Sequence, residues 1–173
     1  GRTIEFVAFV NEEPPYFMTE AMGSRVFTRL AKKNNENIKA AVILEMIGFY
    51  SQHPNSQRYP PFFGMFYPNK GNFIGVVGNF RSYGLVKKVQ NNFRKNSRFP
   101  IQATTTFSWL PGIYFSDHWS FWQERYPAVM ITDTSFLRNK NYHLHTDTPE
   151  TLDYNAMACV IEGLSSVLTA LAH

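Results

Sequence analysis

Apolar runs with the composition of strands recur along the chain. Thr3 to Val10, "TIEFVAFV", is β-branched and aromatic and ends in a Pro-rich turn, which predicts a strand. Ile38 to Phe49 is a continuous apolar run with one acid, the profile of a strand buried on both faces. The sequence also predicts short aromatic strands within 58–79, and further strands at 101–107 and 126–134.

Amphipathic stretches separate these strands. Residues 19–34 predict a helix with Thr19 as its cap, and residues 81–96 predict a second one. Residues 151–172 predict a closing helix, with Asp153 in a capping role. Its apolar stripe consists of Leu152, Met157, Val160, Ile161, Leu164 and Leu168. Alternating strands and helices predict an α/β fold, a three-layer sandwich around a mainly parallel, mixed sheet.

Composition narrows the class of protein. With 173 residues, 44% hydrophobic and 16% aromatic, we expect one domain, residues 1–173, with one sizeable core. The net charge of +4 is modest, and the basic stretch Lys87 to Arg98 is interpreted as the solvated face of a helix rather than a nucleic-acid site. No apolar run approaches the roughly 20 residues that a membrane span needs. A single cysteine, Cys159, excludes an internal disulfide and is expected to be buried.

Acidic and histidine side chains follow several predicted strands. Glu12 and Glu13 come after the first strand, and Glu45 lies near the end of the second. Later segments carry Asp117, His118, His143 and His145. Each alone is most often a cap, a surface group or a hydrogen-bonded histidine. Functional groups gather beyond the carboxyl ends of strands in such sheets, so together they indicate an oxygen- and nitrogen-rich metal site that suits zinc.

Six segments, in this order along the chain, carry a resemblance to a known family: "RTIEFVAFVNEE", "AMGSRVF", "AVILEMIG", "SDHWSFW", "YPAVMITDT" and "YHLHTDTPETLDYNAM". The chain resembles the zinc aminopeptidase family that includes the bacterial leucyl and aminopeptidase Y type enzymes. Transferrin-receptor-like and glutaminyl-cyclase-like proteins share that fold.

The resemblance implies a role for each matching position. Glu12 would be the general base and Glu13 a zinc ligand, so that the metal neutralises one carboxylate while its neighbour takes a proton. Glu45 would be a second ligand, at a position where the family commonly has Asp. His143 fits the family pattern HxxxDT, whereas His145 is two residues too close to the Asp-Thr pair. The family site holds two Zn²⁺ ions.

The resemblance also implies the substrate, a peptide with a free amino terminus. The aromatic segment 107–122 would form part of its side-chain pocket, which favours a hydrophobic first residue. Asp117, His118, His145 and Tyr114 are the candidates for the pocket or for support of the ligands, with a structural hydrogen-bonding role for Asp117 and His118 equally open.

One ligand histidine and a bridging aspartate of the family would precede Gly1. We therefore expect a catalytic domain truncated at its N-terminus, with an incomplete ligand set and little activity by itself. Two alternatives stay open: a glutaminyl-cyclase-like single-zinc acyltransferase, and a non-catalytic receptor-like domain. The sequence indicates neither compartment nor oligomeric state.

Overall fold

A four-stranded sheet forms the centre of the molecule. The computed structural model describes residues 1–173, and its strands are β1 (Ala41–Glu45), β2 (Ile74–Asn79), β3 (Ile101–Thr106) and β4 (Ala128–Thr132). The spatial order is β1-β4-β2-β3. β1 is parallel to β4 and β2 is parallel to β3, while β2 and β4 are antiparallel. The mixed, mainly parallel sheet is therefore confirmed, and it consists of two parallel pairs that run in opposite directions.

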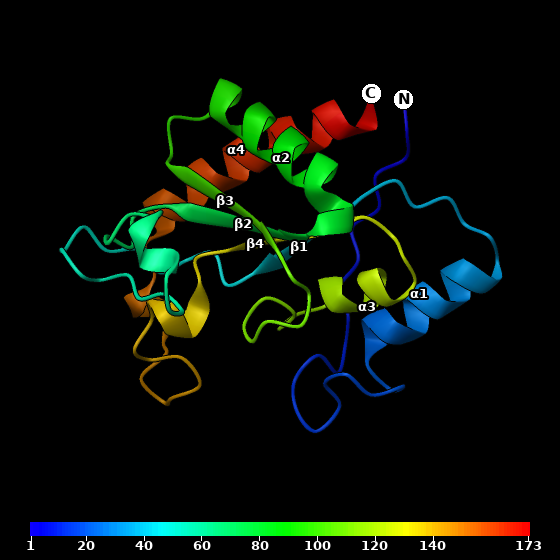
Figure 1. The fold of residues 1–173 in the computed structure, drawn as a ribbon, viewed down its shortest axis with the longest axis horizontal. Helices are drawn as coiled ribbons and strands as arrows, with labels where there is room; N and C mark the ends of the chain where they lie inside the picture. Colours follow the sequence, from blue (N-terminus) through cyan, green and yellow to red (C-terminus); the bar gives the residue numbers. More distant parts are fainter.

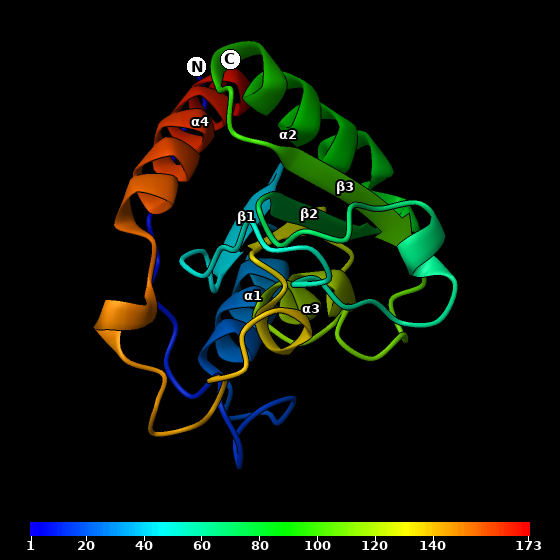
Figure 2. The ribbon, with the colours of Figure 1, turned by 90° about the vertical axis from the view of Figure 1, so that its left-hand side faces the viewer.

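Helices cover both faces of this sheet. Helices α2 (Tyr83–Asn96) and α4 (Tyr154–Ala172) lie on one face, and α1 (Gly23–Lys33) and α3 (His118–Gln123) lie on the other (Figure 1). The view in Figure 2 shows the same three layers from the side. Four short 3₁₀ turns complete the structure: Phe63–Met65, Phe80–Ser82, Ser135–Leu137 and Pro149–Thr151. The predicted three-layer α/β sandwich is confirmed.

The principal core lies between the sheet and the helices α2 and α4. Phe93 of α2 and Val160 of α4 are fully buried in it, together with the inward residues of β2 and β4. Gly163 allows the two helices to approach closely, because a Cβ at this position would lie 2.4 Å from the Phe93 ring. A smaller cluster joins α1 and α3 to β1 through Phe121, Trp122 and Ala41.

Helix α4 has 19 residues and a mean hydropathy of 1.5, so by length and composition alone it could cross a membrane. A core helix passes the same test, and here Val160, Leu164 and Val167 are buried in the principal core. The opposite side of α4 is exposed. Ile161 and Cys159 lie on that side, so the expectations of a buried Cys159 and of an inward Ile161 are wrong. The Asp153 cap is confirmed, since its Oδ1 accepts from the Ala156 N–H at 2.9 Å.

Other sequence expectations differ from the structure at the edges of elements. Residues 3–10 form no strand, because no strand of this chain pairs with them, and Phe6 is 87% exposed. α1 begins at Gly23, four residues after Thr19, whose hydroxyl instead bonds to the Tyr16 carbonyl within a turn. β1 is an edge strand rather than a strand buried on both faces. Within 58–79, Pro and Gly leave β2 as the one strand.

Candidate active site

The parallel pair β1 and β4 brings two carboxylates to one edge of the sheet. Glu45 is the last residue of β1 and is in register with Thr132, and Asp133 follows directly after β4. Because parallel strands end at the same edge, these side chains are neighbours although 88 positions separate them in the sequence.

Asp133 is a structural anchor for this edge. It is buried, and its Oδ2 accepts from the backbone N–H groups of Gly48 at 3.1 Å and Phe49 at 2.7 Å. Its Oδ1 accepts from the Ser135 N–H at 2.9 Å. These bonds fix the turn that follows Glu45, so Asp133 positions β1 and β4 relative to each other at the site.

Glu45 is held by a hydroxyl that comes from a distant segment. Ser116, buried just before α3, donates its Oγ–H to Oε2 of Glu45 at 2.7 Å. Burial raises the pKa of Glu45, and the nearby carboxylates of Glu13 and Asp117 raise it further, while the Ser116 bond opposes both effects. A buried carboxylate among other carboxylates, with one oxygen already bonded, is well prepared to bind a cation.

Glu12 and Glu13 lie in a turn rather than at the end of a strand. The Glu13 carbonyl accepts from the N–H groups of Tyr16 and Phe17, which closes the turn. Glu12 is half-buried, and desolvation followed by the charges of Glu45 and Glu13 raises its pKa to about 7. A carboxyl group with such a pKa exchanges a proton readily near neutral pH.

His143 lies against Glu13, the second residue of this pair. Its Nε2 lies 3.3 Å from Oε1 of Glu13. The imidazole stacks on the Tyr142 ring, with 3.9 Å between the ring centroids, and the His143 backbone has a left-handed φ of 58°. This loop conformation is uncommon for a non-glycine residue, and the stacking holds the imidazole in place.

The donor pair fits zinc. Two ligand atoms that each lie 2.0–2.2 Å from a tetrahedral zinc are about 3.4 Å apart, close to the distance between Glu13 and His143. Carboxylate oxygen and imidazole nitrogen are both usual zinc ligands. The chain does not assemble three or more His, Cys, Asp or Glu side chains in a geometry that could hold an ion. Glu45 is close enough to raise the pKa of Glu12, but it does not join Glu13 and His143 as a third ligand of the same ion.

The other four predicted residues take different places. His118 is fully buried, bonds through Nε2 to the Ile113 carbonyl at 2.7 Å, and packs edge-on against Trp122. Asp117 is near the glutamates, and its buried Oδ1 has no hydrogen-bond partner. Tyr114 packs edge-on against Phe115, and His145 is exposed in the loop after His143.

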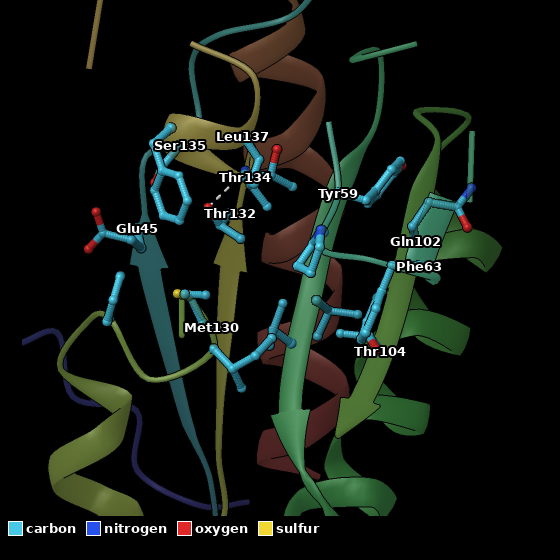
Figure 3. A pocket seen from close by; sticks show the side chains of 18 of the residues that line it. Glu45, Tyr59, Phe63, Gln102, Thr104, Met130, Thr132, Thr134, Ser135 and Leu137 are labelled. Atoms are coloured by element: carbon cyan, nitrogen blue, oxygen red, sulfur yellow. Dashed lines mark hydrogen bonds between the residues drawn. The ribbon is translucent and has the colours of Figure 1, made fainter. Parts of the chain in front are cut away.

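A groove extends from Glu45 across the face of the sheet that α2 and α4 leave uncovered. Its floor runs from Met130 and Thr132 on β4 to Gln102 and Thr104 on β3 (Figure 3). It has a volume of about 850 Å³, part of which is open to solvent, and most of its lining is apolar.

The walls of the groove come from two loops. Part of the predicted aromatic segment contributes one wall, with Ile113 and Phe115, whereas Phe107, Trp109 and Tyr114 do not line the groove. The other wall, formed by Tyr59, Phe63 and Tyr67, was not predicted from sequence. These three rings stack in pairs at 5.8 and 6.2 Å, and the Tyr67 hydroxyl donates to the Ala103 carbonyl on β3.

Sequence reasoning missed Ser116, Tyr142 and the anchoring role of Asp133. Ser116 directly precedes the Asp-His pair that was singled out, and Tyr142 directly precedes His143, so proximity to candidate residues was the available signal. Neither contact follows a helical or strand period, and both depend on loops that meet only in the folded chain.

Comparison with known proteins gives a family match and several relatives. Residues 1–168 match Peptidase family M28. The chain is 41% identical over 166 residues to Uncharacterized protein YfbL of Escherichia coli strain K12, which covers 95% of this chain and 50% of that protein. It is 29% identical over 160 residues to Leucine aminopeptidase 1 of Ajellomyces dermatitidis, and that match covers 90% of this chain and 35% of the fungal protein.

Solved structures agree on the fold. LapB from Legionella pneumophila superimposes with a TM-score of 0.63 at 15% identity, and the LapA aminopeptidase from the same organism with 0.57 at 19%. Each match covers 87% of this chain and about a third of the solved chain, 36% for LapB and 35% for LapA. The chain thus spans half or less of the length of these relatives. The family match over nearly the whole chain shows that it belongs to peptidase family M28.

Proposed function

We propose that this chain supplies one part of a two-zinc aminopeptidase site. The observation that carries the proposal is the 3.3 Å approach of Glu13 Oε1 to His143 Nε2, the separation expected for two ligands of one ion. Glu45, oriented by Ser116, would bind the second ion. The similarity to a fungal leucine aminopeptidase and to the LapA aminopeptidase supports the aminopeptidase part of the proposal.

Glu12 acts as the general base in this proposal. It lies beside the ligand Glu13, it is half-buried, and it makes no hydrogen bond that would occupy its carboxylate. When bound, zinc would polarise the peptide carbonyl and acidify a water molecule. Glu12 would accept the proton of that water and deliver it to the departing amine.

The negative charge of the site favours peptides with a free amino terminus. The charges of Glu13 and Asp117 lie close enough to raise the pKa of both Glu12 and Glu45, so the site attracts a protonated α-amino group. The apolar groove beginning at Glu45 would receive the side chain of the first residue, and its stacked tyrosine and phenylalanine wall favours a large hydrophobic side chain.

The 173 residues are proposed to form one catalytic unit with an incomplete ligand set. They provide two candidate ligands for one ion and one for the other, whereas catalytic zinc usually has three protein ligands. We therefore expect the isolated 173-residue chain to hydrolyse leucine-4-nitroanilide poorly even with added zinc. Robust turnover by this chain alone would overturn that part of the proposal.

The role of Glu12 is tested in the complete protein with Glu12→Gln. Turnover of leucine-4-nitroanilide should fall about 10²- to 10⁴-fold because the proton acceptor is lost. Zinc content, measured by inductively coupled plasma mass spectrometry, should not change. Glu36→Gln, at an exposed position away from the site, is the matched control and should retain full turnover. Unchanged turnover in Glu12→Gln, or loss of zinc from it, would contradict the assignment.

A further inference from the structure

Charge is distributed unevenly along this chain. Residues 46–116 contain eight Lys and Arg residues and no Asp or Glu. All 13 acidic residues lie in the remainder, with nine basic ones. The acid-free segment includes β2, α2 and β3, so every charged side chain on α2 is positive, and Glu12, Glu13 and Glu45 lie outside this segment.

Exposed aromatic rings lie at the start of α2, within this cationic segment. The Phe80 and Phe107 rings meet edge to face at 5.0 Å, and Phe107 stacks on Trp109 at 5.5 Å. One turn further along, Lys87 Nζ lies 5.7 Å from the centroid of the Tyr83 ring. We name Phe80, Tyr83, Lys87, Phe107 and Trp109 the aromatic–basic strip.

The aromatic side chains of the strip are unusually exposed to solvent. Trp109 is 68% exposed, and Phe80, Tyr83 and Phe107 are each more than half exposed. Single exposed apolar side chains need no explanation, but three exposed rings in mutual contact, with the exposed Tyr83 three residues after Phe80, mark an interaction surface. Lys88 and Lys95 add exposed cations along the outer side of α2.

The strip lies far from the peptide site. β2 and β3 run antiparallel to β4, so their carboxyl ends, which lead to Phe80 and Phe107, are at the edge of the sheet opposite to Glu45 and Asp133. In Figure 3 the arrowheads of β2 and β3 point away from the end that carries Glu45. A partner could therefore cover the strip while the catalytic groove stays open to water.

We propose that the aromatic–basic strip binds the surface of a membrane that contains anionic lipids. Trp, Tyr and Phe rings favour the interface between headgroups and acyl chains, and adjacent Lys and Arg side chains are attracted to anionic headgroups. Charge complementarity disfavours a second copy of the same strip, because both surfaces would be cationic. None of the five strip residues lines the groove of Figure 3, whereas single-stranded nucleic acids are held in positively charged grooves.

Vesicle sedimentation of the complete protein tests this proposal. Binding is compared between vesicles of phosphatidylcholine alone and vesicles in which about a third of the lipid is phosphatidylserine. We expect binding to the anionic vesicles only, with a blue shift of the tryptophan emission as Trp109 leaves water. High salt should release the protein, since the attraction between exposed charges is screened.

Two variants address the two halves of the strip. Phe107→Ser combined with Trp109→Ser should abolish the binding, and Lys87→Glu combined with Lys88→Glu should weaken it at least about tenfold. The matched controls are Tyr154→Ala, an exposed aromatic position on α4, and Lys33→Glu with Lys39→Glu, exposed positions with the same change in charge. Both controls should bind like the wild type, and all variants should keep their peptidase activity.

Three results would overturn the proposal. The first is equal binding to neutral and anionic vesicles, or binding to neither. The second is unchanged vesicle binding by both strip variants. The third is binding to a single-stranded oligonucleotide that the strip variants abolish, without binding to vesicles, which would make the strip a nucleic-acid surface.

Discussion

The core beneath α2 and α4 and the carboxylate site at the end of β1 are stabilised in different ways. Twelve buried side chains form the core, all of them apolar, and they come from strands and helices with regular periods. The site consists of Glu12, Glu13, Glu45 and His143, most of them in loops, and polar contacts over long sequence distances hold it together. The core therefore determines stability, and the site determines chemistry at some cost to stability.

This contrast implies that mutations separate into two classes. Changes in the core should lower the free energy of unfolding and leave the activity of the folded molecules unaltered. Changes in the polar contacts around the site should lower activity with little effect on unfolding. The following predictions, for the complete protein, run from the largest expected effect to the smallest.

Phe93→Ala should have the largest effect. Phe93 is fully buried and fills the space above Gly163, so truncation removes apolar contacts and leaves a cavity. We expect the free energy of unfolding to fall by about 3–5 kcal/mol, measured by urea denaturation. Phe66→Ala, at an exposed position, should cost less than about 0.5 kcal/mol. Equal losses for the two variants would show that the core does not carry the stability.

Ser116→Ala should lower activity and leave the stability nearly unchanged, in contrast to Phe93→Ala. It removes the 2.7 Å bond to Glu45, so the carboxylate loses its fixed orientation, and activity or metal affinity should fall about 10- to 100-fold. The urea midpoint should shift little. Ser120→Ala removes another buried hydroxyl, one that bonds to Ser24 instead, and should keep full activity. If both variants are equally active, the Ser116 bond does not support the site.

His118 should make stability dependent on pH. Burial lowers the pKa of His118 to about 4, below its ordinary value of about 6.5. Its neutral form therefore contributes stability that is fully present above pH 6.5 and is lost as the pH falls toward 4.

Between pH 7 and pH 5 this loss should amount to about 2 kcal/mol. Urea denaturation at both pH values measures it, and His118→Gln, which keeps a donor for the Ile113 carbonyl, should show a loss smaller by that amount. The same pH dependence in both proteins would contradict this explanation.

The fold could be predicted where local pattern and burial agree. The α2 and α4 helices, β3 and β4, and the Asp153 cap follow from apolar periodicity and a capping residue. The strand predicted at residues 3–10 failed because a strand also needs a partner, and composition does not supply one. Cys159 was placed wrongly because an apolar helix with little charge does not reveal which of its sides is covered.

The site could be predicted only as a set of candidates. The family resemblance named Glu13 and His143, and the structure places them 3.3 Å apart. Residue spacing could not reveal the Ser116 bond to Glu45 or the Tyr59, Phe63 and Tyr67 wall, because these contacts join loops whose conformations depend on the whole fold.

The central claim is that Glu13 and His143 share one zinc ion while Glu12 stays off the metal. Crystals of the complete protein grown with zinc, with anomalous diffraction recorded at the zinc absorption edge, test it most directly. The account predicts an anomalous peak about 2.0–2.2 Å from both Glu13 Oε1 and His143 Nε2, with the Glu12 carboxylate uncoordinated. A zinc peak that neither Glu13 nor His143 contacts, or one bound by Glu12 in place of Glu13, would contradict it.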